Sequence, residues 1–290
     1  MRVTQRMMSA SMMTHLQRQA DPIRRALEQL SSGQRMQRPS DHPADMGQML
    51  TVREALSAVE QHSRNVIRAK ERFAMSESTL SAVDELLDRA RSIAMSAEQD
   101  PGVMADLAEE VAVIQEQIVA FANTRSEEGH LFAGHLSHQP PFLPDGTYQG
   151  DGGEFRVAVG AGVAIRISAD GRDVFTPPAG VDIFATLESL RAALAASDPV
   201  QVASQVTPLT AAIDQVNLYR AESAVRHSQL EMAESHLAVV GHRLEETLAD
   251  TGEIDMAEVI MELQRRETAY EASLAASARL FETGLLQYLR

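Results

Sequence analysis

The stretch LSSGQRMQRPSDHPAD, residues 30–45, lies between two helical patterns and constrains the fold more than any other part of the chain. Gly33 predicts the end of the first helix, because the residue after a helix terminus often adopts positive φ, which glycine does at little cost. Pro39 and Pro43 exclude a continuous helix through the segment, although Pro43 is tolerated in a first helical turn. The stretch therefore predicts a joint between two helices, and either Ser40 or Asp41 can cap the second one.

Both ends of the chain carry a single apolar stripe at helical spacing. The N-terminal stripe contains Met12, Leu16, Ile23, Leu27 and Leu30. The C-terminal stripe, in residues 254–290, contains Ile260, Leu263, Tyr270, Leu274, Phe281, Leu285 and Leu289. A helix with one narrow stripe cannot form a core alone. We therefore expect the two helices to pair as a terminal coiled coil, and neighbouring copies to cover what the pair leaves exposed, so that these residues pack subunits in a helical lattice.

Longer apolar ladders fill the middle of the chain. Residues 43–97 keep close to a seven-residue period, and the Asp-Pro-Gly sequence at 100–102 predicts a sharp break before a second helix that ends near residue 125. Ser63, Lys70 and Glu77 occupy positions of the ladder where an apolar residue is expected, and such polar positions more often set register than perform chemistry. A further long ladder runs from residue 199 to a second joint at Gly252.

Residues 136–182 have a different character, with several prolines and many glycines. Apolar residues alternate with other residues on both sides of the Gly-Ala-Gly turn at 160–162, which predicts a β-hairpin. A third strand is expected at Asp173–Phe175, and a short helix follows over residues 183–194.

The expected fold is mainly α: a long antiparallel coiled-coil or helical-bundle rod with a small β-rich inserted domain and paired terminal helices. The expected domains are a terminal coiled-coil region (1–38 with 252–290), a helical rod (39–135 with 183–251) and a β-rich surface insert (136–182).

Charge and composition exclude several classes of function. The formal net charge of −15 argues against a nucleic-acid partner, because binding phosphates needs a basic surface. The absence of cysteine excludes disulfides, thiol catalysis and thiolate metal sites. No apolar run is long enough to span a membrane, so no membrane insertion is expected, and no cleavable signal peptide is visible.

No group of residues predicts catalysis. The histidines at 130, 135 and 138 lie in a linker containing Gly and Pro and lack the spacing of a metal-binding helix. The polar residues Asp145, Thr147, Gln149, Asp151 and Glu154 resemble a calcium loop only distantly, and a turn entering a hairpin explains them equally well. We therefore expect a protein that is not an enzyme, with no catalytic, metal or cofactor-binding residues and no cofactor.

Three segments resemble one known family. The joint LSSGQRMQRPSDHPAD, the segment ANTRSEEGHLFAG at residues 122–134 and the ending LLQYLR are similar to the flagellin superfamily, and most of all to flagellar hook-associated proteins of the FlgL type, which form the hook–filament junction. The signature residues of the joint are Ser32, Gly33, Arg38, Pro39, Ser40, Asp41 and Pro43. His42 and Asp45 depart from the usual pattern, in which Asp and Gly often stand at those positions.

The resemblance implies a structural adaptor that joins the flagellar hook to the filament. It also implies export through the flagellar type III channel without a cleaved signal, and a position outside the cell at the hook–filament junction. The partners it implies are the preceding hook-associated protein, flagellin and an export chaperone that covers the C-terminal helix.

Two alternatives remain beside the junction protein. A short filament flagellin has the same architecture, but the RPSD-x-P joint and the YLR ending argue against it. A cytoplasmic coiled-coil signalling or binding module would also fit long amphipathic helices. An enzyme is the weakest hypothesis, since no catalytic group was found.

Overall fold

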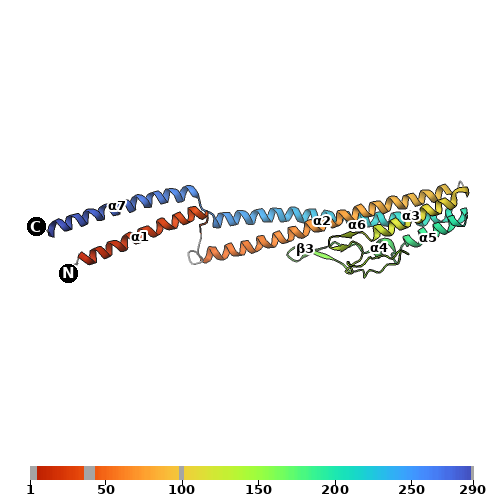
Figure 1. Ribbon diagram of the computed structural model, residues 1–290, viewed down its shortest axis with the longest axis horizontal. Helices are drawn as coiled ribbons and strands as arrows, with labels where there is room; N and C mark the ends of the chain where they lie inside the picture. The colour runs from red at the N-terminus through yellow and green to blue at the C-terminus, as the bar shows by residue number, and fades with distance from the viewer. Residues whose placement is uncertain (1–4, 36–42, 98–100, 289–290) are drawn as a thin grey trace. The chain divides into compact units, whose positions relative to one another are not determined.

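The computed structural model describes residues 5–35, 43–97 and 101–288, and its secondary structure is mainly helical (Figure 1). The helices are α1 (Gln5–Ser32), α2 (Pro43–Ala97), the 3₁₀ turn η1 (Pro101–Val103), α3 (Met104–Ala122), α4 (Gly171–Phe175), α5 (Ile183–Ala195), α6 (Pro199–Gly252) and α7 (Met256–Tyr288). Two small antiparallel sheets accompany them. The predicted fold class is confirmed.

The chain divides into two compact units. Unit 1 contains Met1–Ser57 and Gly241–Arg290, and unit 2 contains Ala58–Val240. Helices α2 and α6 each contribute residues to both units, because the boundaries fall within them. The division of the sequence into terminal coiled coil, rod and insert stays a prediction.

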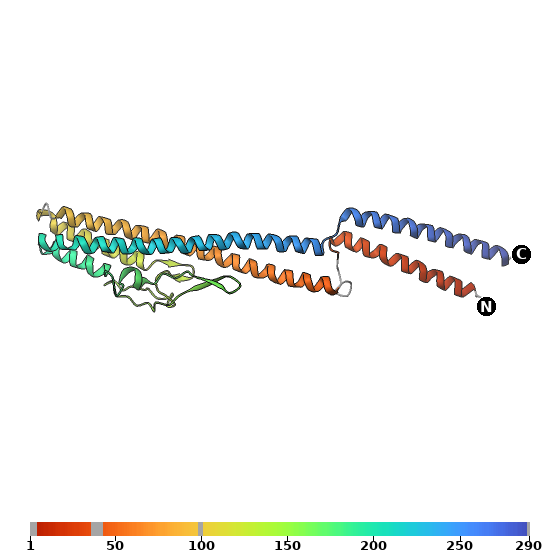
Figure 2. The same cartoon turned by 180° about the vertical axis from the view of Figure 1, so that it is seen from behind.

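The helices of unit 2 run alongside one another (Figure 2). A large apolar core lies between them and holds the unit together. The fully buried side chains of this core include Leu80, Leu87, Met104, Ile118, Leu187 and Leu190. Two of the three polar positions in the ladder of α2 face α6: Lys70 Nζ lies 2.7 Å from Glu234 Oε2, and Glu77 Oε1 lies 2.6 Å from Arg220 Nη2. The hydrogen bond from Lys70 to Glu234 raises the pKa of the lysine. These pairs join the two long helices, and the expected role of such polar positions in setting the register stays a prediction.

The segment between α3 and α5 forms the β-rich insert. A first small sheet pairs β1 (Arg125–Ser126) with β2 (Gly129–His130), and a second pairs β3 (Arg156–Gly160) with β4 (Val163–Arg166). The second sheet is the predicted hairpin, with Val157 opposite Ile165. Its turn needs a glycine at residue 162, where φ is +74°.

The third strand expected at Asp173–Phe175 is wrong, because these residues belong to helix α4. Asp170 caps this helix, and its Oδ1 accepts a hydrogen bond of 2.9 Å from the Arg172 amide. One helical turn buries Val174 and Phe175 completely. A strand would place those two neighbouring side chains on opposite faces, so only one of them would reach the core.

Five of the chain's twelve Phe and Tyr residues gather where the insert meets the helices. Phe142 lies 5.2 Å from Phe175 and 5.2 Å from Phe184 between ring centroids, and Phe132 lies 5.4 Å from Phe175. Tyr148 borders this group and donates a hydrogen bond to Asp170, and burial raises the pKa of its phenol. The insert therefore shares the core of unit 2.

Arg72 on α2 attaches the insert from the other side. Its guanidinium is buried and donates to the carbonyl of Leu131 at 3.0 Å and to the carbonyl of His130 at 3.4 Å. It also lies 5.8 Å from the ring centroid of Phe155. Burial lowers the pKa of this guanidinium. Its hydrogen bonds join α2 to the first sheet and satisfy carbonyl groups that are otherwise far from water.

We predict that Arg72→Met lowers the free energy of unfolding of unit 2 by about 2 kcal/mol, because it leaves buried carbonyl oxygens without donors. The measurement is urea denaturation followed by circular dichroism. The matched control is Arg68→Met, an exposed arginine one turn earlier on α2, with an expected change of less than about 0.5 kcal/mol. Equal losses in the two variants would contradict the role of Arg72.

Candidate assembly surface

The first joint in unit 1 has the predicted geometry. Helix α1 ends at Ser32, and Gly33 follows with φ +69°. The amide of Gly33 donates to the carbonyl of Gln29 at 2.8 Å, and the hydroxyl of Ser32 accepts from the amide of Gln34 at 3.2 Å. The prediction that Gly33 terminates the first helix is confirmed.

The second joint is hydrogen-bonded to the first. The amide of Arg35 donates to the carbonyl of Gly252 at 2.7 Å, and the amide of Ile254 donates to the carbonyl of Gly33 at 3.3 Å. Gln34 and Glu253 form an antiparallel bridge between these bonds. A cavity of about 410 Å³ adjoins the paired joints, lined in part by the buried Met49. The two chain segments that leave the terminal helices are thus tied together through their backbones.

Some of the other signature residues of the first joint lie outside the described residues. Pro43 is the first residue of α2, in agreement with the expected tolerance of proline there. Arg38, Pro39, Ser40 and Asp41 fall in the undescribed stretch.

The terminal helices α1 and α7 lie side by side (Figure 1). Ala26 is buried between them with 4% of its surface exposed. Arg266 of α7 donates from Nη1 to the carbonyl of Pro22 on α1 at 3.3 Å and pairs with Glu262 at 2.8 Å. The sequence did not indicate this arginine contact, because the pair Arg265-Arg266 looks like any other charged stretch of a helix surface.

The pair leaves its apolar stripes incompletely covered. Leu27 remains 50% exposed, Ile260 44% and Leu274 42%. The stripe residues that are partly buried are Met12, Leu16, Ile23, Leu30, Leu263 and Tyr270. Phe281 and Leu285 fall within the range of α7, but their side chains are not described, and Leu289 lies outside the described residues. The predicted role of these residues in subunit packing stays a prediction.

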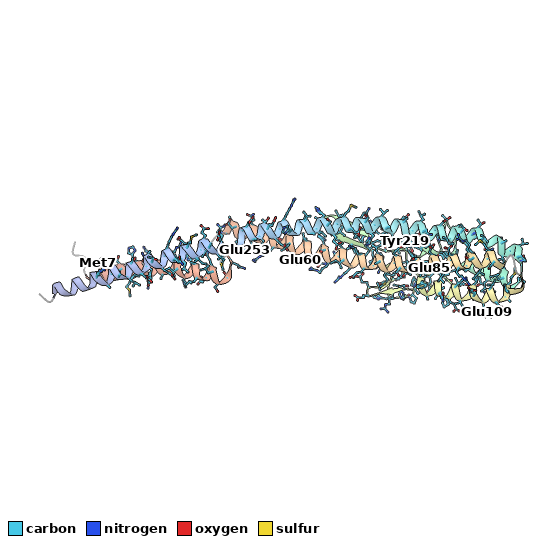
Figure 3. The ribbon with its side chains drawn as sticks, turned by 90° about the horizontal axis from the view of Figure 1, so that it is seen from above. Met7, Glu60, Glu85, Glu109, Tyr219 and Glu253 are labelled. Atoms are coloured by element: carbon cyan, nitrogen blue, oxygen red, sulfur yellow. The ribbon has the colours of Figure 1, made fainter. Side chains whose placement is uncertain are left out.

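A groove of about 630 Å³ runs between the same two helices. One wall comes from α1 and includes Met7, which is 64% exposed and is marked in Figure 3. The other wall consists of small residues of α7, namely Ser273, Ala276 and Ser277. Small residues let another backbone approach closely, and methionine adapts its shape to what it contacts. The groove therefore has the form of a site for a further helix.

Polar groups of the insert serve local structure. Asp151 Oδ1 accepts from the amides of His135 at 2.7 Å and Gly153 at 3.0 Å, and these bonds lower the pKa of the carboxyl group. Asp145 accepts in the same way from the amide of Thr147, which lowers its pKa, and Glu154 pairs with Arg166 at 2.8 Å. Within the described ranges, no three His, Asp or Glu side chains form a group that could hold a metal ion. The helices in these ranges also lack the combination of length and hydropathy needed to cross a membrane.

Residues 3–135 match the family described as the bacterial flagellin N-terminal helical region. This part of the chain is similar to a flagellin N-terminal region. The match covers α1, the Gly33 joint and the segment ANTRSEEGHLFAG.

Similarity extends beyond the flagellin region. The chain is 25% identical to flagellar hook-associated protein 3 of Escherichia coli K12, over 90% of this chain and 90% of that protein. A putative flagellar hook-associated protein from Vibrio parahaemolyticus has the same fold, with a TM-score of 0.68 and 18% identity over 73% of this chain and all of that one. The flagellar junction protein FlgL from Legionella pneumophila matches with a TM-score of 0.58 and 16% identity, over 71% of this chain and all of that one. The resemblance to FlgL-type hook-associated proteins is confirmed.

We predict that Gly33→Ala weakens the paired joints by about 1 to 2 kcal/mol, because an alanine at φ +69° is strained although nothing lies near its side chain. Hydrogen exchange of peptides covering residues 29–35 and 248–256 should accelerate about tenfold. The control is Gly47→Ala, another glycine with open space around it but inside α2, where alanine favours the helix. Unchanged exchange in Gly33→Ala would show that the left-handed conformation is not required.

Proposed function

We propose that this chain is a structural adaptor of the bacterial flagellum that joins the hook to the filament. Its work is the packing of copies around a helical lattice, and it is not an enzyme. The hook-associated protein 3 of Escherichia coli and the junction protein of Legionella pneumophila, to which the chain is similar, support this assignment.

One observation carries the proposal. The paired terminal helices retain exposed apolar side chains along both predicted stripes, together with a groove that a further helix fits. A soluble protein rarely exposes such a surface unless a partner covers it. If the partner is another copy that presents a different face, the contact is heterologous and its repetition generates a tube.

The proposed partners follow from this architecture. The preceding hook-associated protein and flagellin would contact the two ends of the ring of copies, and an export chaperone would cover the C-terminal helix before assembly. The chain would act outside the cell, and residues 136–182 would face the solvent. The terminal region 1–38 with 252–290 would form the lattice core.

The experiment that tests the function is deletion of the gene, followed by electron microscopy of the cells and assay of flagellin in the medium. Hooks without filaments, with flagellin shed into the medium, are the expected result. Normal filaments would refute the junction role. Hooks that still carry short filaments would favour the alternative of a short flagellin.

We predict that Leu27→Glu and Ile260→Glu abolish complementation of the deletion strain. Both side chains are exposed in the free chain, so the substitutions should leave the fold intact while placing a charge in the contact between copies. Swimming motility and filament counts provide the measurement. The matched control is Val163→Glu, an equally exposed apolar residue in the hairpin of the insert, which should complement fully. Complementation by both terminal variants would refute the packing role of the stripes.

A further inference from the structure

Helix α6 carries a second apolar stripe on its outer face, within unit 2. Leu218, Val225, Met232 and Val239 follow one another at intervals of seven residues. Their exposed fractions are 65%, 61%, 62% and 51%. We call these four residues the outer stripe. Four large apolar side chains in a straight line on one helix are not the scattered exposure that a protein surface normally shows.

The outer stripe lies opposite the face of α6 that packs in unit 2. The inner face also repeats every seven residues, through the buried Val216, Ser223, Leu230 and Leu237. Val216 precedes Leu218 by two residues, and two residues correspond to about 200° around a helix. The insert packs against Leu230 and Leu237, so it does not cover the outer stripe. Helix α6 therefore has two faces whose residues repeat every seven positions. One is buried in unit 2 and the other is exposed.

The positions between the large residues of the outer stripe are small. Ala221, Ser228 and Ser235 follow Leu218, Val225 and Met232 by three residues each, and all three are exposed. In an antiparallel helix pair, the first position of a heptad faces the fourth position of the partner, so each large side chain would meet a small one. Such alternation lets the layers interdigitate at close distance. We propose that the outer stripe binds the outer stripe of a second copy of this chain in antiparallel orientation, about a two-fold axis near Ser228.

The sizes of the side chains favour this orientation over a parallel one, whereas the charges beside the outer stripe do not distinguish the two. Glu222 is already paired with Arg226 of its own helix at 3.1 Å. Glu231, an exposed acid beside Met232, would come close to the same residue of the second copy in an antiparallel pair as well. Parallel pairing would set large side chains against large ones and small against small, so that the layers would not interdigitate.

The contact is small, which makes the dimer weak. From Leu218 to Val239 the stripe extends about 32 Å at 1.5 Å per residue, shorter than the helix face that a stable dimer would use. Each copy also carries a formal charge of −15, so the copies repel each other at low salt. Added salt should therefore strengthen the association.

This dimer goes beyond the proposed function and does not depend on it. A two-fold contact reverses the direction of one copy, whereas copies packed around one tube all point the same way. The dimer would therefore be a form of the free chain that separates before assembly. Its stability can be measured on purified protein without any flagellar assay.

The absence of cysteine makes cross-linking decisive. In the full-length chain, Ser228→Cys lies near the proposed axis and should form a disulfide-linked dimer on mild oxidation. Ala221→Cys and Ser235→Cys should each cross-link at least tenfold more slowly alone, but should cross-link to each other when the two variants are mixed. Equal cross-linking of Ala221→Cys with itself would show parallel pairing, and no cross-linking at any of the three positions would refute the contact. Either result overturns the proposal.

Sedimentation equilibrium provides a second measurement that does not depend on cysteine chemistry. The mean mass of the unmodified chain should rise with concentration, and Val225→Glu or Met232→Glu should raise the dissociation constant at least tenfold. The matched control is Val113→Glu, an apolar residue of α3 that is 52% exposed and lies outside the stripe. Far-ultraviolet circular dichroism confirms that the variants fold. A chain that stays monomeric at every concentration, or a control that weakens the dimer as much as the stripe variants, would overturn the proposal.

Discussion

A helix with one narrow apolar stripe must be covered by something other than itself, and this constraint governs the terminal part of the molecule. Pairing α1 with α7 satisfies part of the requirement, since Ala26 is buried and Arg266 reaches the backbone of α1. The remaining exposed surface, at Leu27 and Ile260 among others, makes the pair an incomplete core. Because the missing part is apolar and elongated, a helix from another copy completes it better than a small molecule would.

In unit 2 a different problem arises, because a ladder that repeats every seven residues can slip by seven residues and still bury apolar side chains. Charged pairs remove this ambiguity. Lys70 meets Glu234, and Arg220 meets both Glu77 and Asp84, so a shifted register would leave several charges without partners. Each pair is partly exposed and contributes little stability by itself. Its effect is specificity of register, and the correct register is what brings Arg72 and the insert together.

The main features of the fold could be predicted from the sequence because they depend on periodicity and on backbone chemistry. Gly33 ends its helix as predicted, and the β3–β4 hairpin forms around its glycine turn. Residues 173–175 were predicted incorrectly because the short sequence Asp-Val-Phe suits a strand as well as a helix, and the cap from Asp170 favours the helix. The contacts of Arg72 and Arg266 could not be predicted, since each depends on a carbonyl group brought close by the tertiary fold. The outer stripe of α6 was not predicted, because the buried ladder on the same helix already explains why its apolar residues repeat every seven positions.

The two apolar surfaces of the chain differ in their symmetry. The groove between α1 and α7 has unlike walls, with methionine on one side and small residues on the other, so it accepts a helix that need not present the same groove in return. Such a contact can repeat indefinitely. The outer stripe of α6 alternates large and small residues along a single helix, and it is complementary to itself when reversed. Such a contact closes after two copies. A chain with both surfaces can keep its free copies in small closed assemblies and still polymerise, because polymerisation requires only that the weaker, two-fold contact be released.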